Sequence, residues 1–215
     1  MKYILYLIFF VILNSTTYSQ IKTYDTIPQT INIKCNPFTM FQGPILFTSE
    51  YRLGFEKPIA TFSTIQVIGS YLGKAPYVYY YEAVNNVNDF LIIKGYRLQM
   101  EYKNYFMGRK YGTYPFEGFY WSINGSYAHA TITNPYYRIK EQNISATYQY
   151  LALKLGYQYA HNNYTFDFYY GMGYRNINWH SNIPNSGIGT LNKKDFVPFD
   201  TPIKILLGLN IGYRI

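Results

Sequence analysis

The side chains best suited to acid–base or nucleophilic chemistry are three histidines and a single cysteine. His180 is followed directly by Ser181, and a serine, a histidine and a carboxylate together form a hydrolytic triad. However, adjacent residues on a strand point to opposite faces, so these two side chains do not meet without a turn. We therefore expect His180 to be a polar residue at the start of a loop, and we predict no catalytic residue.

The remaining residues of this kind do not predict a metal or cofactor site. Cys35 cannot form an internal disulfide, and no histidine cluster accompanies it, so we expect a small apolar side chain on a strand. His161 falls in a tight His-Asn-Asn turn, and His129 shares a face with Tyr127. No glycine-rich phosphate loop is present. The sequence therefore predicts no metal ion and no cofactor.

Ten charged residues share the polar face of segments in which polar and apolar residues alternate. They are Glu50, Arg52, Arg97, Glu101, Lys103, Lys154, Asp167, Arg175, Lys204 and Arg214. Two interpretations are open: a paired network that fills the inside of a barrel, or the lining of a narrow ion pathway. We predict the structural network, because the interior of an eight-stranded barrel is just wide enough to be filled by side chains.

The elements that carry these charges are predicted from a period of two, which is the period of a β-strand. In the last segment, Ile203, Ile205 and Leu207 begin an apolar face, and Lys204 and Gly208 lie on the other, where Leu206 is an exception. The same alternation gives eight strands, within residues 30–40, 45–55, 63–73, 89–106, 118–130, 152–159, 164–175 and 203–215. Pro37 predicts a bulge or bend, because proline cannot donate to a strand ladder.

The connections between these strands alternate in length, except for the first gap at 42–44. We expect short gaps at 56–60, 107–115 and 161–163, and longer ones at 74–88, 133–143 and 181–201. Short turns at one end and longer loops at the other are typical of an outer-membrane β-barrel.

The first twenty residues resemble a secretory signal peptide. Lys2 precedes an apolar run from Tyr3 to Leu13, and small and polar residues follow, with cleavage expected after Ser19. The predicted organisation is a signal peptide at 1–19, a short periplasmic lead-in at 20–29 and a barrel at 30–215. The mature chain has no run of 18 apolar residues, so no transmembrane helix is expected.

Three architectures fit eight alternating strands: a soluble closed barrel, a β-sandwich and a membrane barrel. Only 14% of residues are charged, below the roughly 25% of soluble domains, and 28 residues are tyrosines. The polar face is rich in glycine, as a narrow interior requires. The net charge of +8 is spread along the chain without a dense basic run, so nucleic-acid binding is not predicted.

Aromatic residues of the apolar face gather near the ends of the predicted strands, which favours the membrane barrel. With both termini in the periplasm, the periplasmic strand ends carry a belt on the apolar face, and the opposite ends carry a thinner one. The first belt is Phe55, Tyr102, Phe106, Phe119, Trp121, Tyr157, Tyr159, Tyr164 and Tyr213, and the second is Tyr71, Phe90 and Tyr127.

Three segments resemble the small outer-membrane β-barrel proteins of Bacteroidota-type bacteria. They are NIKCNPFTMFQGPILFTSEYRLGFEKP, GYRLQMEYKNYF followed by PFEGFYW, and LGYQYAHNNYTFDFYYGMGYR leading to GLNIGYRI. The family usually ends in phenylalanine, and Ile215 departs from that. The resemblance implies an eight-stranded barrel in the outer membrane and no agreed activity.

The resulting prediction is a closed, antiparallel, up-and-down transmembrane β-barrel with a filled lumen and a structural or surface-interaction role, without enzyme activity. Its expected partners are outer-membrane lipid, the barrel-assembly machinery, and an envelope or extracellular partner that binds the outer loops. The alternatives are a lipid-modifying outer-membrane enzyme, a small channel and a soluble ligand-binding barrel.

Overall fold

The computed structural model describes residues 30–41, 43–45, 47–86, 92–107, 116–133, 143–181 and 202–215. The predicted signal peptide at 1–19 and the lead-in at 20–29 lie outside these residues, as does most of the predicted loop at 181–201.

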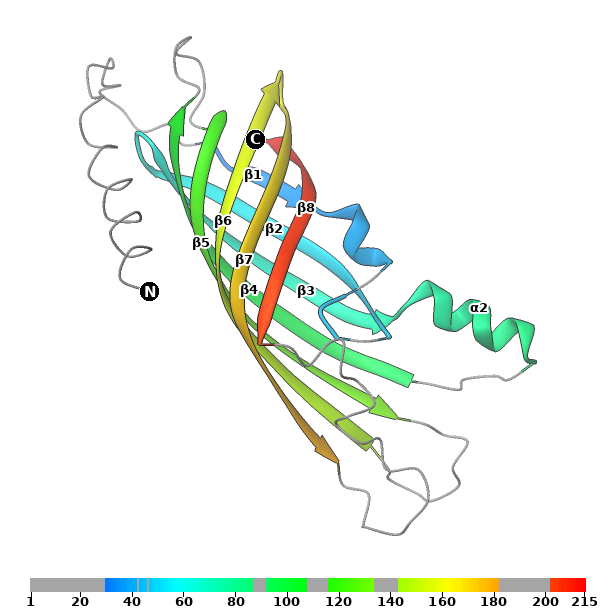
Figure 1. Ribbon diagram of the computed structural model, residues 1–215. Helices are drawn as coiled ribbons and strands as arrows, with labels where there is room; N and C mark the ends of the chain where they lie inside the picture. Colours follow the sequence, from blue (N-terminus) through cyan, green and yellow to red (C-terminus); the bar gives the residue numbers. More distant parts are fainter. Residues whose placement is uncertain are drawn as a thin grey trace.

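Eight antiparallel strands form one closed barrel, in which each strand pairs with its neighbours in the sequence and β8 closes on β1 (Figure 1). The strands are β1 (Asn32–Cys35), β2 (Thr48–Ala60), β3 (Ser63–Lys74), β4 (Ile92–Met107), β5 (Gly118–Thr133), β6 (Asn143–His161), β7 (Tyr164–Ser181) and β8 (Ile203–Arg214). The predicted all-β, closed, up-and-down architecture of eight strands is confirmed.

The two ends of the barrel differ. At the end that we call the turn end, two-residue turns join β2 to β3 and β6 to β7. Asn162, in the second of these turns, has φ 51°, a left-handed conformation that asparagine tolerates better than most residues. Ile215 also lies at the turn end, where it exchanges backbone hydrogen bonds of 2.9 and 3.0 Å with Ile31. We call the opposite end the loop end.

The first strand is much shorter than predicted. It stops at Cys35, and Pro37 begins a 3₁₀ helix, η1 (Pro37–Met40), where a bulge or bend was expected. Asn36 caps this helix, because its side chain accepts a hydrogen bond from the Phe38 amide at 3.0 Å. As a consequence, no described strand lies between residues 48–53 of β2 and residues 203–210 of β8.

The second strand is longer than predicted. A gap at 56–60 was expected, but β2 continues to Ala60 and the turn is Thr61–Phe62, so this prediction is wrong. The pairing of β2 with β3 accommodates Pro58 by a shift in register between Pro58 and Ala60. Glu56, expected in a turn, is fully buried on the inner face.

The predicted loop at 74–88 contains an α-helix, α2 (Pro76–Val84), at the loop end. It projects sideways from the barrel beyond the end of β3 (Figure 1). Lys74 at the end of β3 pairs with Glu82 at 2.8 Å. The hydroxyl of Tyr77 accepts a hydrogen bond from the Phe47 amide at 2.9 Å, and partial burial raises the pKa of this phenol above its ordinary value.

Side chains alternate between a buried inner face and an exposed outer face along every long strand. The inner side chains fill the space that the sheet encloses, so the core of this protein is the lumen of its own barrel. Within the described residues, no helix has the length and apolar character needed to cross a membrane.

Candidate functional site

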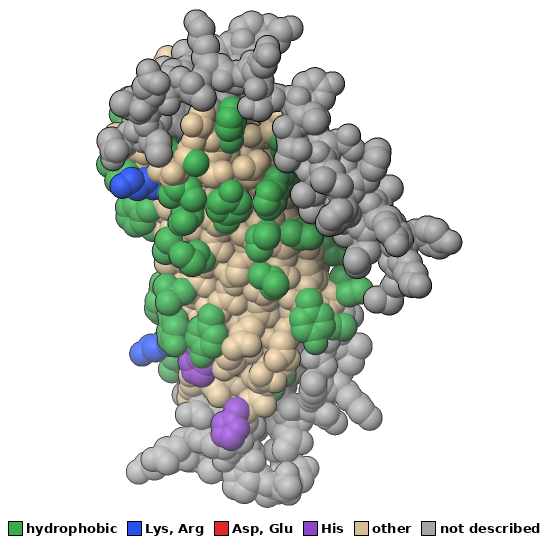
Figure 2. Space-filling view, turned by 90° about the vertical axis from the view of Figure 1, so that its left-hand side faces the viewer, with side chains coloured by type: hydrophobic (Ala, Val, Ile, Leu, Met, Phe, Trp, Pro, Cys, Tyr) green, Lys and Arg blue, Asp and Glu red, His purple; other side chains and the backbone are tan. Residues whose placement is uncertain are grey.

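The outer surface of the barrel is an apolar belt with almost no charge. Leu151, Leu153 and Leu155 on β6 are 59–62% exposed, and Leu207 on β8 is 83% exposed. Among the described strand residues that face outward, Lys57 and Lys94 are the only Asp, Glu, Lys or Arg residues, and both lie near strand ends. Figure 2 shows the same pattern on one face, where hydrophobic side chains cover the wall between two basic residues.

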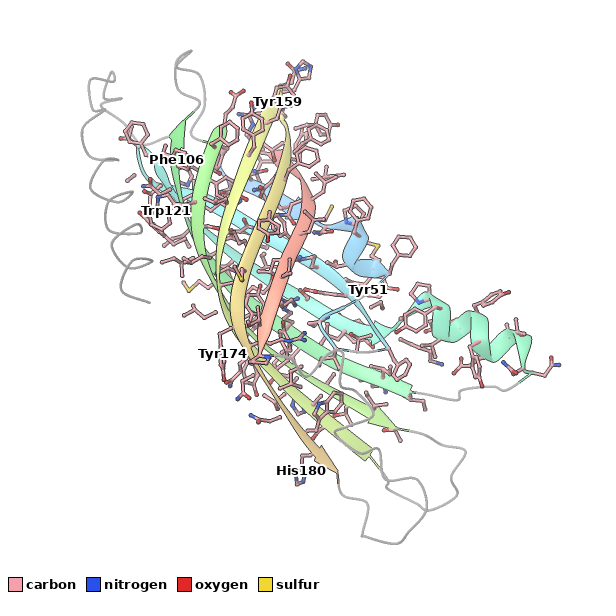
Figure 3. All side chains as sticks on the ribbon, in the orientation of Figure 1. Tyr51, Phe106, Trp121, Tyr159, Tyr174 and His180 are labelled. Carbon is pink, nitrogen blue, oxygen red and sulfur yellow. The ribbon has the colours of Figure 1, made fainter. Side chains whose placement is uncertain are left out.

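Aromatic side chains border this belt at both ends. At the turn end, the nine residues of the first predicted belt all lie on the outer face, and three pairs are in ring contact. These pairs are Phe119–Tyr157 at 4.7 Å, Tyr164–Tyr213 at 5.4 Å and Tyr102–Trp121 at 5.8 Å between centroids. Figure 3 shows Phe106, Trp121 and Tyr159 near this end.

The rim at the loop end is fuller than the sequence predicted. Tyr71 and Tyr127 lie there as expected, and Phe90 lies outside the described residues. Tyr51, Tyr96 and Tyr174 are also exposed at this level. Tyr71 stacks on Tyr51 at 6.5 Å, and Tyr127 contacts Tyr96 at 6.3 Å. Tyr51 and Tyr174 lie well away from the turn-end aromatics in Figure 3.

Beyond this rim the outer face becomes polar. Strands β5, β6 and β7 continue past the tyrosines, and their outward side chains there include Gln149, Asn176, Asn178 and the exposed His180. His180 lies far beyond Tyr174 in Figure 3. The apolar belt therefore has two boundaries, of which the one at the loop end runs through Tyr127 and Tyr174.

Inside the turn end lies a neutral group of four buried charges, which we call the inner cluster: Lys34, Glu56, Lys103 and Asp167. Lys34 contacts Glu56 at 2.6 Å and Asp167 at 2.8 Å, and Lys103 contacts Asp167 at 2.6 Å and Glu56 at 3.6 Å. All four side chains are no more than 1% exposed. Two cations and two carboxylates thus compensate one another in a place that water does not reach.

Neutral side chains complete the inner cluster. The Tyr120 hydroxyl donates to Asp167 at 2.6 Å, and the Tyr105 hydroxyl donates to Glu56 at 3.0 Å. The side-chain oxygen of Gln158 accepts from Lys34 at 2.7 Å. Since buried charges are stable only when their remaining hydrogen-bonding positions are filled, these groups are part of the network.

A single ion pair lies next along the lumen. Lys154 contacts Glu101 at 2.7 Å, and Glu101 also accepts hydrogen bonds from Ser122 at 2.7 Å and Asn124 at 3.0 Å. The Lys154 ammonium lies 4.6 Å from the centre of the Tyr169 ring. This pair is electrically neutral.

The charges in the loop-end half form a group that we call the outer cluster: Glu50, Arg52, Arg97 and Lys204. Arg97 contacts Glu50 at 2.6 Å, and Arg52 lies 3.7 Å from Glu50. Arg52 also donates a hydrogen bond to Gln99. The Lys204 ammonium donates to the Tyr148 hydroxyl at 2.6 Å. This cluster holds three cations and one carboxylate.

The two remaining predicted residues also face inward. Arg175 is half-buried opposite Tyr150 on β6, and Arg214 is buried opposite Asn32 on β1. All ten residues of the predicted network therefore lie on the inner face, in three separate groups and these two positions. The sequence analysis missed Lys34 and Glu56. The alternation in β1 already placed Lys34 on the polar face, but the predicted turn removed Glu56 from its strand.

The rest of the lumen is filled by apolar and small side chains. Leu206, the exception on the polar face of β8, belongs to a buried apolar group in the loop-end half with Leu72, Ile177 and Tyr148. Small residues make room for inward tyrosines. A Cβ on Gly156 would collide with the Tyr120 ring, and one on Gly208 would collide with the Tyr169 hydroxyl.

The residues considered for chemistry do not converge. His180 is exposed and pairs in register with Ser145, while the side chain of Ser181 lies outside the described residues. His129 lies on the outer face, 3.3 Å from Thr147, and His161 is exposed at the end of β6. Cys35 is exposed on β1. Among the described residues, no group of three or more potential ligands could hold a metal ion.

Comparison with known proteins adds one structural likeness. No protein-family model matches the chain, and no curated protein matches it. Among solved structures, the chain is similar to a major outer membrane protein from Thermus thermophilus, with 10% sequence identity and a TM-score of 0.40. The match covers 86% of this chain and 98% of that protein.

Proposed function

We propose that this protein is an integral outer-membrane β-barrel with a filled lumen and a structural or surface-interaction role. The observation that carries the proposal is the apolar belt, which has no charge between two aromatic rims. Exposure of this apolar surface to water is unfavourable. Contact with lipid hydrocarbon is favourable, because no charged side chain of the belt is then removed from water.

The dimensions of the belt match a bilayer. On β7, the outward side chains from Tyr164 to Tyr174 are apolar or aromatic, and β6 matches this from Leu151 to Tyr159. A tilted transmembrane strand needs about 9–11 residues to cross the hydrocarbon core. Tyrosine and tryptophan rings suit the headgroup level at each boundary, because they combine an apolar body with a polar tip.

The lumen supports a structural role. Its turn-end half is closed by the inner cluster, by Tyr105 and Tyr120, and by the hydrogen bonds among them. Such packing opposes flow, so a channel is the weaker candidate. The dispersed positions of His129, His161 and His180 favour the absence of catalysis.

The loop end supports the surface role. With the turn end in the periplasm, α2 lies on the outer side and exposes Tyr77, Tyr79, Tyr80 and Tyr81 by 42–73%. Exposed tyrosines of this density are typical of contact surfaces, because they supply area at a low cost in side-chain entropy. We infer that α2 and the loops beside it contact envelope or extracellular components.

Gel mobility combined with photolabelling tests this proposal. Outer-membrane fractions run unheated and boiled are expected to give two mobilities, as an intact membrane barrel does. A lipid-soluble photolabel is expected to modify Leu153 and Leu207 and to spare Lys154. Labelling of Lys154 with protection of Leu153, or partition of the unheated protein into the aqueous phase without detergent, would overturn the assignment.

A further inference from the structure

The charged groups that we have named in the lumen differ in their balance of charge. The inner cluster is neutral, and so is the pair Glu101–Lys154. In the outer cluster, Arg52, Arg97 and Lys204 face only Glu50 among the described carboxylates, which leaves an excess of two positive charges before Arg175 is counted. Burying three cations beside one carboxylate is unfavourable in a low-dielectric interior, and a compensating anion would reduce this cost.

Two cations of the outer cluster share one aromatic surface. The Arg97 guanidinium lies 5.2 Å from the centre of the Tyr150 ring, and the Lys204 ammonium lies 5.2 Å from the same centre and 4.8 Å from that of Tyr148. The hydroxyl of Ser126 accepts from Arg97 at 2.8 Å. Two cations held toward one another by a pair of tyrosines are an arrangement that an anion between them would stabilise.

The inner and outer clusters also differ in how deeply their charged groups are buried. The Lys34 and Lys103 side chains of the inner cluster are 1% exposed, whereas the Arg52 side chain is 7% exposed. Arg52 on β2 and Lys204 on β8 also lie on the two stretches of wall that no described strand separates, where η1 replaces β1. The outer cluster is thus buried less completely than the inner cluster, and it lies beside this break in the sheet.

We propose that the outer cluster binds one phosphate-class anion, with Arg52, Arg97 and Lys204 as its ligands. Guanidinium groups match the geometry of phosphate oxygens, and a positive excess favours a phosphate monoester, which carries about −1.5 to −2 charges at neutral pH. The same chemistry is present in a free phosphate and in the headgroup of an acidic lipid that reaches the site beside η1.

Calorimetric titration of the purified barrel in an uncharged detergent tests this proposal. The probes are inorganic phosphate and dihexanoyl phosphatidic acid, and saturable binding of one per chain is expected for at least one of them. Lys204→Gln and Arg52→Gln are each expected to weaken binding about tenfold or more. The matched control is Lys57→Gln, which removes an outward lysine at the turn end and is expected to bind as the original protein does.

The two probes distinguish the sources of the anion. Binding of inorganic phosphate with equal or weaker binding of phosphatidic acid indicates a free anion, and at least tenfold tighter binding of phosphatidic acid indicates a lipid headgroup. No saturable binding of either probe up to about 10 mM, or unchanged binding by Lys204→Gln, would overturn the proposal. Heat-dependent gel mobility verifies that each variant is a closed barrel.

A second measurement covers variants that do not close. Phosphate is then compared with an equal ionic strength of chloride for its effect on the unfolding temperature of the unmodified protein. A rise with phosphate alone supports the site, and equal unfolding temperatures contradict it. Both measurements use purified protein, so their outcome is independent of where the barrel resides in the cell.

Discussion

Asp167 on β7 contacts polar side chains of four other strands. It accepts from Lys34 on β1, Lys103 on β4 and Tyr120 on β5 at 2.6–2.8 Å. Asp167→Asn keeps the shape of the side chain but leaves two lysines facing Glu56 alone. Removing one partner of a buried ion pair costs about 3–5 kcal/mol, so we expect a loss of that size in the free energy of unfolding.

Urea titration of tryptophan fluorescence in lipid vesicles measures this loss. The compensating double variant Asp167→Asn with Lys34→Met restores equal numbers of charges around Glu56 and Lys103, and it is expected to recover part of the stability. A single variant as stable as the original protein would show that the inner cluster contributes nothing to folding.

Gly156 is required by the tyrosine that it faces. Its missing Cβ leaves the space in which the Tyr120 ring lies, and the Tyr120 hydroxyl is fixed on Asp167. Gly156→Ala forces the ring or the backbone to move, which costs about 1–3 kcal/mol. Gly125→Ala is the matched control, because Gly125 faces outward and a Cβ added there would have nothing within 4 Å, and we expect a change below about 0.5 kcal/mol. Equal effects of the two substitutions in the same titration would contradict this account.

The direction of most charged lumen side chains was predictable from the sequence, with Glu56 as an exception, but their partners were not. Alternation alone placed Lys103, Lys154 and Asp167 on one face, because successive side chains of any β-strand point to opposite faces whatever the fold. The contact of Asp167 with Lys34 joins residues 133 positions apart in the sequence, and it depends on how far the strands are staggered around the barrel. No local pattern carries that information.

At the scale of elements, α2 depends on the ion pair that attaches it to β3. Lys74→Met removes one partner of Glu82, while Tyr77 and the buried Val78 still hold the helix. We expect chymotrypsin to cleave α2 several-fold faster in this variant, because a detached helix of nine residues is unstable in water. The barrel itself is expected to keep its gel mobility.

Two variants control for the loss of a lysine. Exchange of the charges, Lys74→Glu with Glu82→Lys, is expected to restore resistance to chymotrypsin, and Lys57→Met is expected to leave cleavage of α2 unchanged. Equal cleavage rates in Lys74→Met and the original protein would show that α2 is held by other contacts.

The sequence predicted the long strands better than the segments between them. The strand period is clear in β4, β6 and β7, where apolar and polar residues alternate over many positions. The helix α2 was missed because its tyrosines surround it on several sides, so no helical period stands out. The end of β2 was missed because Lys57 and Pro58 suggested a turn, whereas a bulge accommodates the proline within the strand.

At the scale of the molecule, the apolar belt makes stability depend on the depth of each outward residue. Leu153→Arg places a charge in the middle of the belt, whereas Gln149→Arg, on the same strand and the same face, places it beyond the tyrosine rim. In a bilayer we expect the first to cost about 2–4 kcal/mol and the second about 0–1 kcal/mol. Urea titration of both variants folded into phosphatidylcholine vesicles measures the difference. Equal effects would argue that water, not lipid, covers the belt.

The short β1 gives the closed sheet a weak seam. Seven of the pairings join strands that follow one another along the chain, whereas the pairing of β1 with β8 joins the two extremes of the barrel through only four residues of β1. Bringing such distant segments together has the largest entropic cost of any strand pairing in the fold. Only a short ladder of paired residues stabilises the contact in return. We therefore expect the pairing of β1 with β8 to form last when the barrel folds, and the sheet to open along the same seam when it unfolds.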